Sequence, residues 1–335
     1  MINKNLVIPR KNGVNFIRYV FAYALIIFHY NILSGHDVFW LLQGGYRIKA
    51  FFILTGFLTF YSYFKHPGAK EFAKRRFKRL VPSYVFTVLL CFFGCSLLSE
   101  YSFAEYFTSS QSYRYLVANL TFLNFLGPDL PGVFTHNESQ AVNGSLWTMK
   151  IDIMFYVTVP FLYYLFRKYP KRWVLAGIFL ITVIYNEVFE YLYQHSGSSL
   201  YLMLKRQIGG QYIYFLAGMC IYFYYQQVHS QVKWLLPVSV VIFLVGSYYD
   251  SWEYLTAFCY AVIIMELSLN AKVLSRFSEV PNVTYGLYLY HFPVVQILLH
   301  FKVNEWSHTG CCLLCLGIVT LLSIMNYQLI EKRIK

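Results

Sequence analysis

IRYVFAYALIIFHY, residues 17–30, is an apolar run that carries an arginine near its start and a histidine near its end. Arg18 and His29 are eleven residues apart, about three helical turns, so a helix presents both side chains on one face. Because ionisable side chains are costly to expose to lipid, this stripe predicts a protein interior or a wet cavity. The residues alone leave two interpretations. Either Arg18 reaches the headgroups and His29 is a satisfied core histidine, or both take part in function.

Further apolar runs along the chain predict an all-α, polytopic membrane protein. Hydrophobic residues make up 58% of the 335 residues and charged residues only 13%, about half of the charge of a soluble domain. No cleavable signal is expected at the N-terminus. We expect one domain over residues 1–335 with about ten transmembrane helices, near 14–33, 48–64, 81–99, 147–166, 173–191, 208–225, 234–250, 253–270, 283–301 and 310–330.

The positive charge follows this membrane pattern. The net charge is +13, and twenty lysines and arginines lie in segments on the side of the termini, against six on the other side. The positive-inside rule therefore places both termini in the cytoplasm. Because the charge tracks topology, it does not indicate nucleic-acid binding. The seven cysteines all lie in apolar runs and predict no metal site.

One connection is unusually long. Residues 100–146, on the predicted outer side, contain turn signals and many aromatic residues. Such a connection in a compact protein is usually functional, so we expect a lid or a re-entrant segment here rather than a disordered loop.

Gly56 in the second predicted span favours close helix packing.

A basic segment precedes the third predicted span. Its sequence, Lys74-Arg75-Arg76-Phe77-Lys78-Arg79, has five cations in six positions. Arg76 and Arg79 are i, i+3 neighbours and suit one phosphorylated ligand. On the residues alone, the segment is equally a cytoplasmic anchor.

Two later spans contain polar groups that need partners. Asp152 lies just inside the outer end of the fourth span, where a buried carboxylate pairs with a cation or a histidine. Its candidate partners are His29, at similar depth, and Lys150 or a neighbouring backbone group. In the ninth span, Pro293 releases the carbonyl of residue 289 and leaves a polar spot beside His291.

The chain contains five motifs in a fixed order: R-x10-H (18–29), FFILTGFL (51–58), R-x-x-R-L-x-P (76–82), N-G-S-L-W-T-x-x-x-D-x-x-F-Y-x-x-x-P (143–160) and YGLYLYHFP (285–293). Together they resemble acyltransferase family 3, a family of integral-membrane O-acyltransferases, mostly bacterial, that modify surface polysaccharides and related envelope molecules. The likeness covers about residues 13–332.

The resemblance implies roles for individual residues. Arg18 and His29 match an arginine and an essential histidine, and Arg76 and Arg79 match a cytoplasmic arginine pair. Asp152 stands where the family usually has glutamate; it keeps the charge, but its side chain is one methylene shorter. The chain resembles the stand-alone members that lack an extracytoplasmic hydrolase-like domain.

The expected function is transfer of an acyl group, with acetyl as the favoured group, from cytoplasmic acyl-CoA to a sugar hydroxyl of an envelope polysaccharide or its lipid-linked precursor. His29 would act as general base, or as a transient acyl carrier, and Asp152 would orient it. Donor binding is assigned to Arg76, Arg79 and Arg18; Asn143, Trp147, Tyr156 and His291 are supporting residues.

This reaction requires a path across much of the bilayer, and it needs no permanently bound cofactor. The expected location is the bacterial plasma membrane. The competing hypothesis is a transporter or flippase for lipid-linked sugars, which has no need of a cytoplasmic arginine pair leading to an Arg–His stripe. The sequence leaves open the acyl group, the sugar and whether the chain forms a homo-oligomer.

Overall fold

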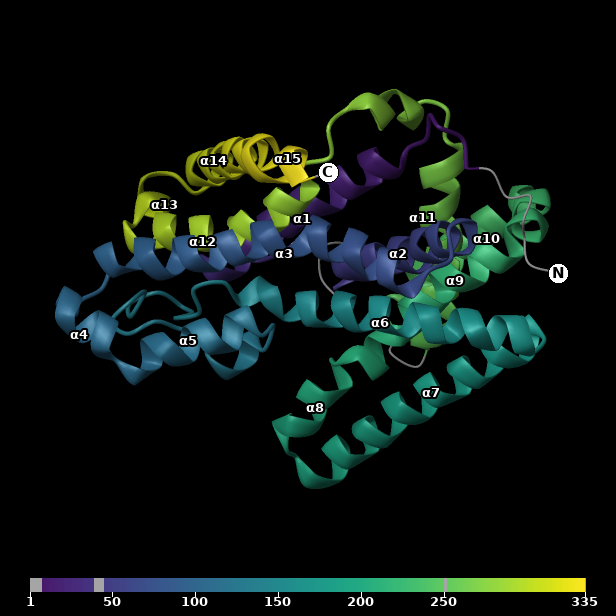
Figure 1. Cartoon of the computed structure of the whole chain (residues 1–335), viewed down its shortest axis with the longest axis horizontal. Coiled ribbons are helices and arrows are strands. Elements are labelled where there is room, and N and C mark those ends of the chain that lie inside the picture. The colour runs from purple at the N-terminus through teal and green to yellow at the C-terminus, as the bar shows by residue number, and fades with distance from the viewer. Residues whose placement is uncertain (1–7, 39–44, 250–251, 335) are drawn as a thin grey trace. The chain divides into compact units, whose positions relative to one another are not determined.

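The computed structural model describes residues 8–38, 45–249 and 252–334, and the regular elements in these ranges are helices (Figure 1). They form two compact units. The first contains Met1–Arg18, Gly44–Phe72 and Ile151–Val280, and the second contains Tyr19–Gln43, Ala73–Lys150 and Pro281–Lys335. The all-α prediction is confirmed, and a single domain over residues 1–335 remains a prediction. Residue 250 of the predicted span 234–250, together with Lys4 and Lys335 of the charge count, lies outside the described residues.

The first unit is organised around α9, which packs against α2, α7 and α11. A Cβ atom added to Gly56 would lie 2.1 Å from the Phe215 carbonyl oxygen, and one added to Gly218 would lie 2.0 Å from that of Ile53. The close packing expected at Gly56 is therefore confirmed, and its partner is α9. The helices of this unit are α2 (Tyr46–Lys65), most of α6 (Trp147–Lys168), α7 (Lys171–Ser196), α8 (Ser199–Lys205), α9 (Ile208–Ser230), α10 (Val232–Gly246), α11 (Glu253–Asn270) and η6 (Leu274–Glu279).

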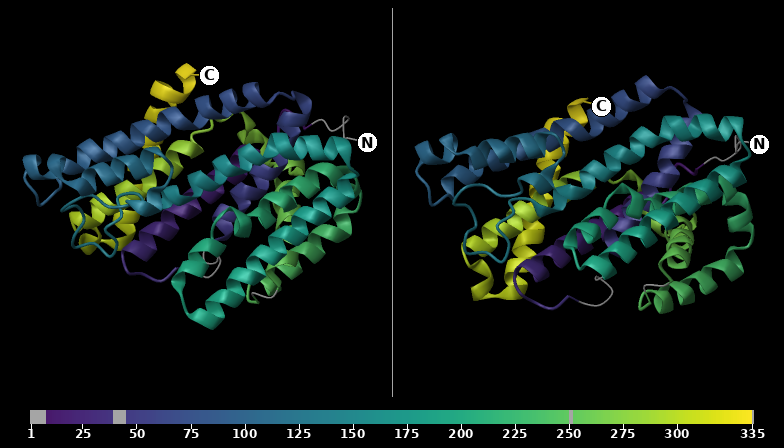
Figure 2. Two further views of the ribbon diagram at one scale, coloured as in Figure 1. Left: turned by 60° about the horizontal axis from the view of Figure 1, so that its bottom comes forward. Right: turned by 90° about the horizontal axis from the view of Figure 1, so that it is seen from below.

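Gly197 ends α7 with a positive φ of 67°, a conformation that favours glycine at a helix C-terminus. The chain then folds back, and α8 packs against α7 (Figure 2).

The second unit holds most of α1 (Val14–Leu33), which carries the Arg–His stripe, and it pairs α12 with α14. A Cβ atom at Gly286 would lie 2.7 Å from the Ser323 Cα, so this glycine permits the close approach of the two helices. The remaining elements are α3 (Ala69–Gly94), η2 (Cys95–Leu97), α4 (Phe103–Thr108), α5 (Ser110–Leu120), η3 (Asn124–Leu126), η4 (Gly144–Leu146), α12 (Thr284–His300), α13 (Val303–Trp306), α14 (His308–Asn326), the π-helical turn η7 (Tyr327–Glu331) and α15 (Lys332–Ile334).

The long connection 100–146 is a folded segment that contains α4 and α5 (Figure 1). A capping box between Ser102 and Glu105 starts α4. The buried Asn119 donates to the Gly127 carbonyl and accepts from Asn124. Gln296 of α12 donates to two carbonyl groups near the end of the segment. These bonds connect the segment to α12 within the second unit, and its role as a lid stays a prediction.

Every predicted span corresponds to a helix, but only some of these helices meet a test of length and apolar composition. Five do so: Val14–Leu33, Ala69–Leu97, Gly144–Lys168, Lys171–Ser196 and His308–Ile334. A sixth is obtained if Ser199–Ser230 and Val232–Gly246, bent by 119°, are counted as one span. The protein is thus a multi-pass membrane protein, with five or six candidate spans among the described residues. The count of ten and the cytoplasmic termini remain predictions.

The helix that contains most of the third predicted span begins twelve residues before residue 81, the predicted start of that span. Residues 74–79 are part of α3, which begins at Ala69, and Pro82 lies inside that helix. Lysine, arginine, glutamate and alanine are good helix formers, so the charges do not prevent the helix from extending beyond the apolar run.

Candidate active site

The helix α1 is continuous from Val14 to Leu33, as the first apolar run predicts. It carries Arg18 and His29, which therefore lie on one face of the same helix. Both side chains are half-buried. Arg18 belongs to the first unit and His29 to the second. The polar path predicted between them stays a prediction.

The described partner of His29 is a second histidine. His29 Nδ1 lies 3.0 Å from Nε2 of His291 on α12, and the centroids of the two rings are 4.9 Å apart. Phe28 and Phe292 contact the His29 ring edge to face, at 5.2 and 5.4 Å between centroids. The hydrogen bond to His291 and these aromatic contacts orient the His29 imidazole.

His291 is completely buried, and its hydrogen bonds specify which nitrogen carries the proton. Its Nδ1 lies 2.8 Å from the Tyr288 carbonyl oxygen and 3.2 Å from that of Leu287. Because a carbonyl oxygen only accepts, Nδ1 is the donor, and Nε2 of the neutral ring is an acceptor. His29 must therefore donate from its own Nδ1. This leaves the lone pair of a neutral His29 on Nε2, as a general base requires.

Asn143 satisfies the carbonyl group that Pro293 releases. Proline has no N–H to donate to the Leu289 oxygen, and the Asn143 side chain donates to that oxygen at 2.9 Å. The Asn143 Oδ1 accepts from the Ser145 hydroxyl at 2.7 Å, and the side chain is 1% exposed. The polar spot predicted next to His291 is therefore confirmed, with Asn143 as its partner.

The start of α6 is also fixed to α12. The Tyr288 hydroxyl lies 2.6 Å from that of Thr148 and also donates to the Ser145 carbonyl. A Cβ atom at Gly144 would lie 2.8 Å from the Phe292 ring, so glycine leaves room for the aromatic group that contacts His29. Trp147, predicted as a supporting residue, is the first residue of α6 and is half-buried.

Asp152 and Tyr156 follow on α6 but belong to the first unit. Both are half-buried, and the Tyr156 ring lies 6.2 Å from that of Phe72. The contact predicted between Asp152 and His29 joins the two units and stays a prediction. Lys150, the alternative partner of Asp152, has its ammonium group 4.4 Å from the centroid of the Phe125 ring.

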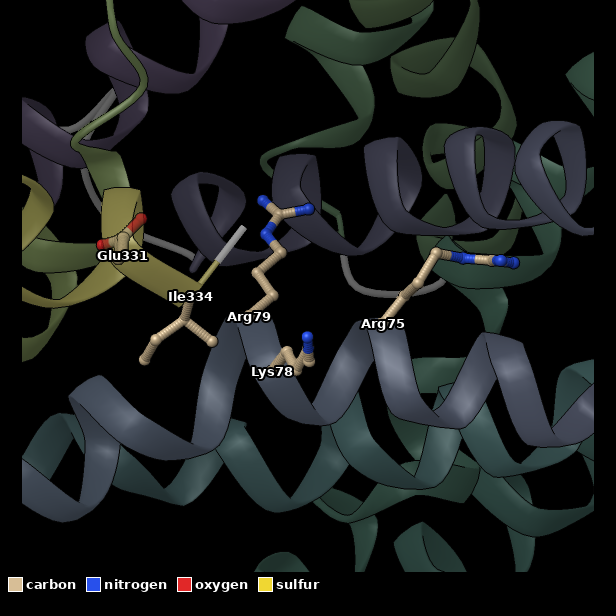
Figure 3. Close-up of a pocket in the computed structure, with 5 residues that line it drawn as sticks. All are labelled: Arg75, Lys78, Arg79, Glu331 and Ile334. Carbon is tan, nitrogen blue, oxygen red and sulfur yellow. The ribbon is translucent and has the colours of Figure 1, made fainter.

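A cavity of about 240 Å³ lies along the basic part of α3 in the second unit (Figure 3). Arg79 lines it as one of the predicted donor-binding residues. Arg76 does not belong to its lining among the described residues; its side chain is half-buried, whereas Arg79 is exposed. The lining also contains Arg75 and Lys78, which belong to the predicted basic segment but were not assigned to donor binding. Its other members, Glu331 and Ile334, were not indicated by the sequence.

Comparison with known proteins identifies the chain. Residues 11–326 match the model of the acyltransferase domain that defines acyltransferase family 3. The chain belongs to this family. It is therefore a membrane-bound acyltransferase, and the predicted resemblance and enzyme class are confirmed. No solved structure matches it.

The chain is similar over most of its length to several named proteins. The chain is 25% identical to an O-acetyl transferase of Shigella phage Sf6, over 97% of its own length and 96% of the relative's. It is 24% identical to nodulation protein 10 of Rhizobium leguminosarum bv. viciae, over 82% and 78% of the two chains. It is 22% identical to O-acetyltransferase OatA of Staphylococcus aureus, over 96% of its own length but 57% of the relative's.

Proposed function

We propose that the protein is an O-acetyltransferase that moves an acetyl group from cytoplasmic acetyl-CoA to a hydroxyl of an envelope polysaccharide or its lipid-linked precursor. Two relatives that are similar over nearly the whole chain are named O-acetyltransferases, one from a phage and one from a bacterium. The proposal includes cytoplasmic termini, which the distribution of lysine and arginine supports.

The observation that carries the chemistry is the bond between the two histidines. In a neutral His29 that donates from Nδ1 to His291, Nε2 has the lone pair that accepts a proton. In the proposed step, His29 Nε2 takes the proton of the acceptor hydroxyl while the oxygen attacks the thioester carbonyl carbon. The carbon–sulfur bond then breaks, and the leaving thiolate takes the proton from His29.

His291 assists this step because its Nε2 accepts from His29 before and after proton transfer. When His29 is an imidazolium, the same hydrogen bond becomes charge-assisted and stronger. Arg18 and Asp152 belong to the proposal on the basis of the sequence: Arg18 would bind the donor and Asp152 would stabilise the imidazolium.

The test uses the purified protein in proteoliposomes with isotopically labelled acetyl-CoA and envelope polysaccharide. The wild-type protein should form a labelled O-acetyl ester. His29→Ala should reduce the rate by about 10²–10⁴-fold, the range of a lost general base, while it inserts and accumulates normally. His195→Ala is a matched control, since His195 is exposed at the end of α7. Near-normal turnover of His29→Ala would exclude His29 as the base.

A further inference from the structure

The cavity beside α3 brings together three kinds of side chain (Figure 3). Arg75, Lys78 and Arg79 are exposed cations, spaced i, i+3 and i+4, so they lie on one face of α3. The other two lining residues, Glu331 and Ile334, are the last residues of η7 and α15. Three cations and one carboxylate give the lining a net charge of +2 at pH 7.

The carboxylate of Glu331 is held in place by a buried network. Its Oε1 accepts from Asn326 Nδ2 at 2.9 Å. The same amide group of Asn326 donates to the Ser83 hydroxyl on α3, and its Oδ1 accepts from Tyr290 on α12. Glu331 is 9% exposed and ends the π-helical turn η7, an element that often occurs at functional sites. A carboxylate positioned in this way is an acceptor for an amino group.

The three cations, the carboxylate and the apolar side chain of the lining favour some phosphate-bearing ligands over others. Phosphate alone would not need an acceptor beside the cations, because a carboxylate opposes anion binding. An amine-bearing phospholipid headgroup supplies a phosphate and an amino group, but its phosphodiester carries only one negative charge. A phosphomonoester carries about −1.5 to −2 at pH 7, which matches the +2 lining, and an adenine ring adds an exocyclic amine and an apolar face.

We propose that this cavity binds the 3′-phosphoadenosine end of the coenzyme A donor. Arg75, Lys78 and Arg79 bind the 3′-phosphate, Glu331 accepts a hydrogen bond from the adenine amino group, and Ile334 packs on the ring. The inference rests on the proposed acyl-CoA donor and adds the residues that recognise its nucleotide. The cavity is smaller than the ~300–1,000 Å³ pockets of whole ligands, so it accommodates one end of an extended donor.

The first experiment compares coenzyme A with dephospho-coenzyme A, which lacks the 3′-phosphate, by equilibrium binding to the full-length protein in nanodiscs. Wild-type protein should bind coenzyme A about ten- to hundredfold more tightly, as expected for charge-assisted bonds to one phosphate. The double variant Arg75→Gln/Lys78→Gln should lose most of this preference and bind dephospho-coenzyme A as wild type does. Lys74→Gln, an exposed cation outside the lining, should keep the preference.

The second experiment tests Glu331 with adenosine 3′,5′-bisphosphate and its inosine counterpart as competitors of acetyl-CoA. Inosine has an oxo group in place of the amine, so wild-type protein should prefer the adenosine compound by about tenfold or more. Glu331→Gln offers an amide N–H to the oxo group and should abolish or reverse this preference. A shift in preference is distinct from a folding defect, which would weaken both competitors equally.

Three results would overturn the inference. Equal wild-type affinity for coenzyme A and dephospho-coenzyme A, with acetyl transfer intact, would reject the proposed phosphate subsite but not the proposed function. An unchanged preference for adenosine in Glu331→Gln would remove the base contact. Finally, if phosphatidylethanolamine in the nanodiscs, compared with phosphatidylcholine, protects the basic residues from chemical modification while adenosine bisphosphate does not, the cavity is a lipid site. Absence of any coenzyme A binding would reject the proposed function together with the inference.

Discussion

Replacement of His291 by phenylalanine tests whether the histidine pair prepares His29 for catalysis. Phenylalanine keeps a planar ring in a completely buried position but removes the acceptor that lies 3.0 Å from His29 Nδ1. The Leu287 and Tyr288 carbonyls also belong to the backbone hydrogen-bond ladder of α12, so the substitution does not deprive them of their main-chain donors. The variant should therefore fold and insert.

The expected loss follows from the strength of this hydrogen bond. A neutral hydrogen bond contributes about 0.5–1.5 kcal/mol, and one to a charged group about 1.5–3 kcal/mol. As His29 becomes an imidazolium, the bond to His291 therefore gains about 1–1.5 kcal/mol, or roughly five- to twelvefold in rate. Loss of the fixed tautomer and ring orientation adds to this; for comparison, partners that orient metal-ligating histidines contribute about 10–100-fold. We expect kcat to fall by about 10–100-fold.

The assay is transfer of labelled acetyl groups, measured as kcat and as KM for acetyl-CoA. His291→Phe should lower kcat and leave KM for the donor nearly unchanged. His291→Gln, which retains a carbonyl acceptor, should recover part of the lost rate. His300→Phe is the control, because it is the same substitution at the C-terminal end of the same helix and should retain full activity.

A His291→Phe protein with kcat within about twofold of wild type would refute the role of the pair, because the charge-assisted bond alone predicts a larger loss. A similar loss in His291→Phe and His291→Gln, accompanied by weaker donor binding in both, would indicate a packing role instead.

Three further predictions concern donor binding and packing. Arg79→Ala should weaken acetyl-CoA binding by about 1.5–3 kcal/mol, the energy of a lost charge-assisted hydrogen bond, and should change the rate of the chemical step less than this. Normal acetyl-CoA binding in both Arg76→Ala and Arg79→Ala would show that the basic segment is only a topological anchor. Asn143→Ala should leave the buried Leu289 carbonyl without its side-chain donor and cost about 1–3 kcal/mol, measured by denaturant unfolding against Asn137→Ala, whose half-exposed side chain bonds to Gln296. Gly56→Ala should separate α2 from α9 and lower the midpoint of thermal unfolding, at a cost of about 1–3 kcal/mol or more, whereas Gly177→Ala, with open space around its Cβ position, should have little effect.

Helix positions were predictable because they depend on local composition. Apolar runs indicate where a helix is buried in lipid or protein, and a single proline indicated the carbonyl group near His291 that needed a donor. The start of the third helix was less predictable, because the apolar run begins only at residue 81 and the charged residues 74–79 precede it. In the structure they continue a helix, since charged residues with unbranched side chains favour helix formation as well as apolar ones do.

The side-chain partners were less predictable because they join distant parts of the chain. His29 and His291 are 262 residues apart in sequence, and helix periodicity specifies only the face on which each residue lies. The sequence indicated Asp152 as a partner for His29 because charge complementarity is a strong prior for a buried histidine, and that contact stays a prediction. Charge complementarity gives no indication of a second imidazole as a partner, yet His291 Nε2 lies 3.0 Å from His29 Nδ1. Glu331 was missed for a related reason: only the packing of α14 and η7 brings it to α3.

The two proposed sites of the second unit share one helix. On α12, His291 bonds to His29, while the neighbouring Tyr290 bonds to Asn326, which in turn holds Glu331. Successive residues of a helix point about 100° apart. One turn of α12 therefore directs His291 towards His29, the proposed base, and directs Tyr290 towards Asn326, which holds the carboxylate of Glu331. The proline at 293 and its compensating Asn143 bond fix the shape of this turn. A displacement of α12 would therefore affect both proposed sites, whereas a substitution at Tyr290 or His291 should separate them, with Tyr290→Phe acting on donor binding and His291→Phe on the rate of transfer.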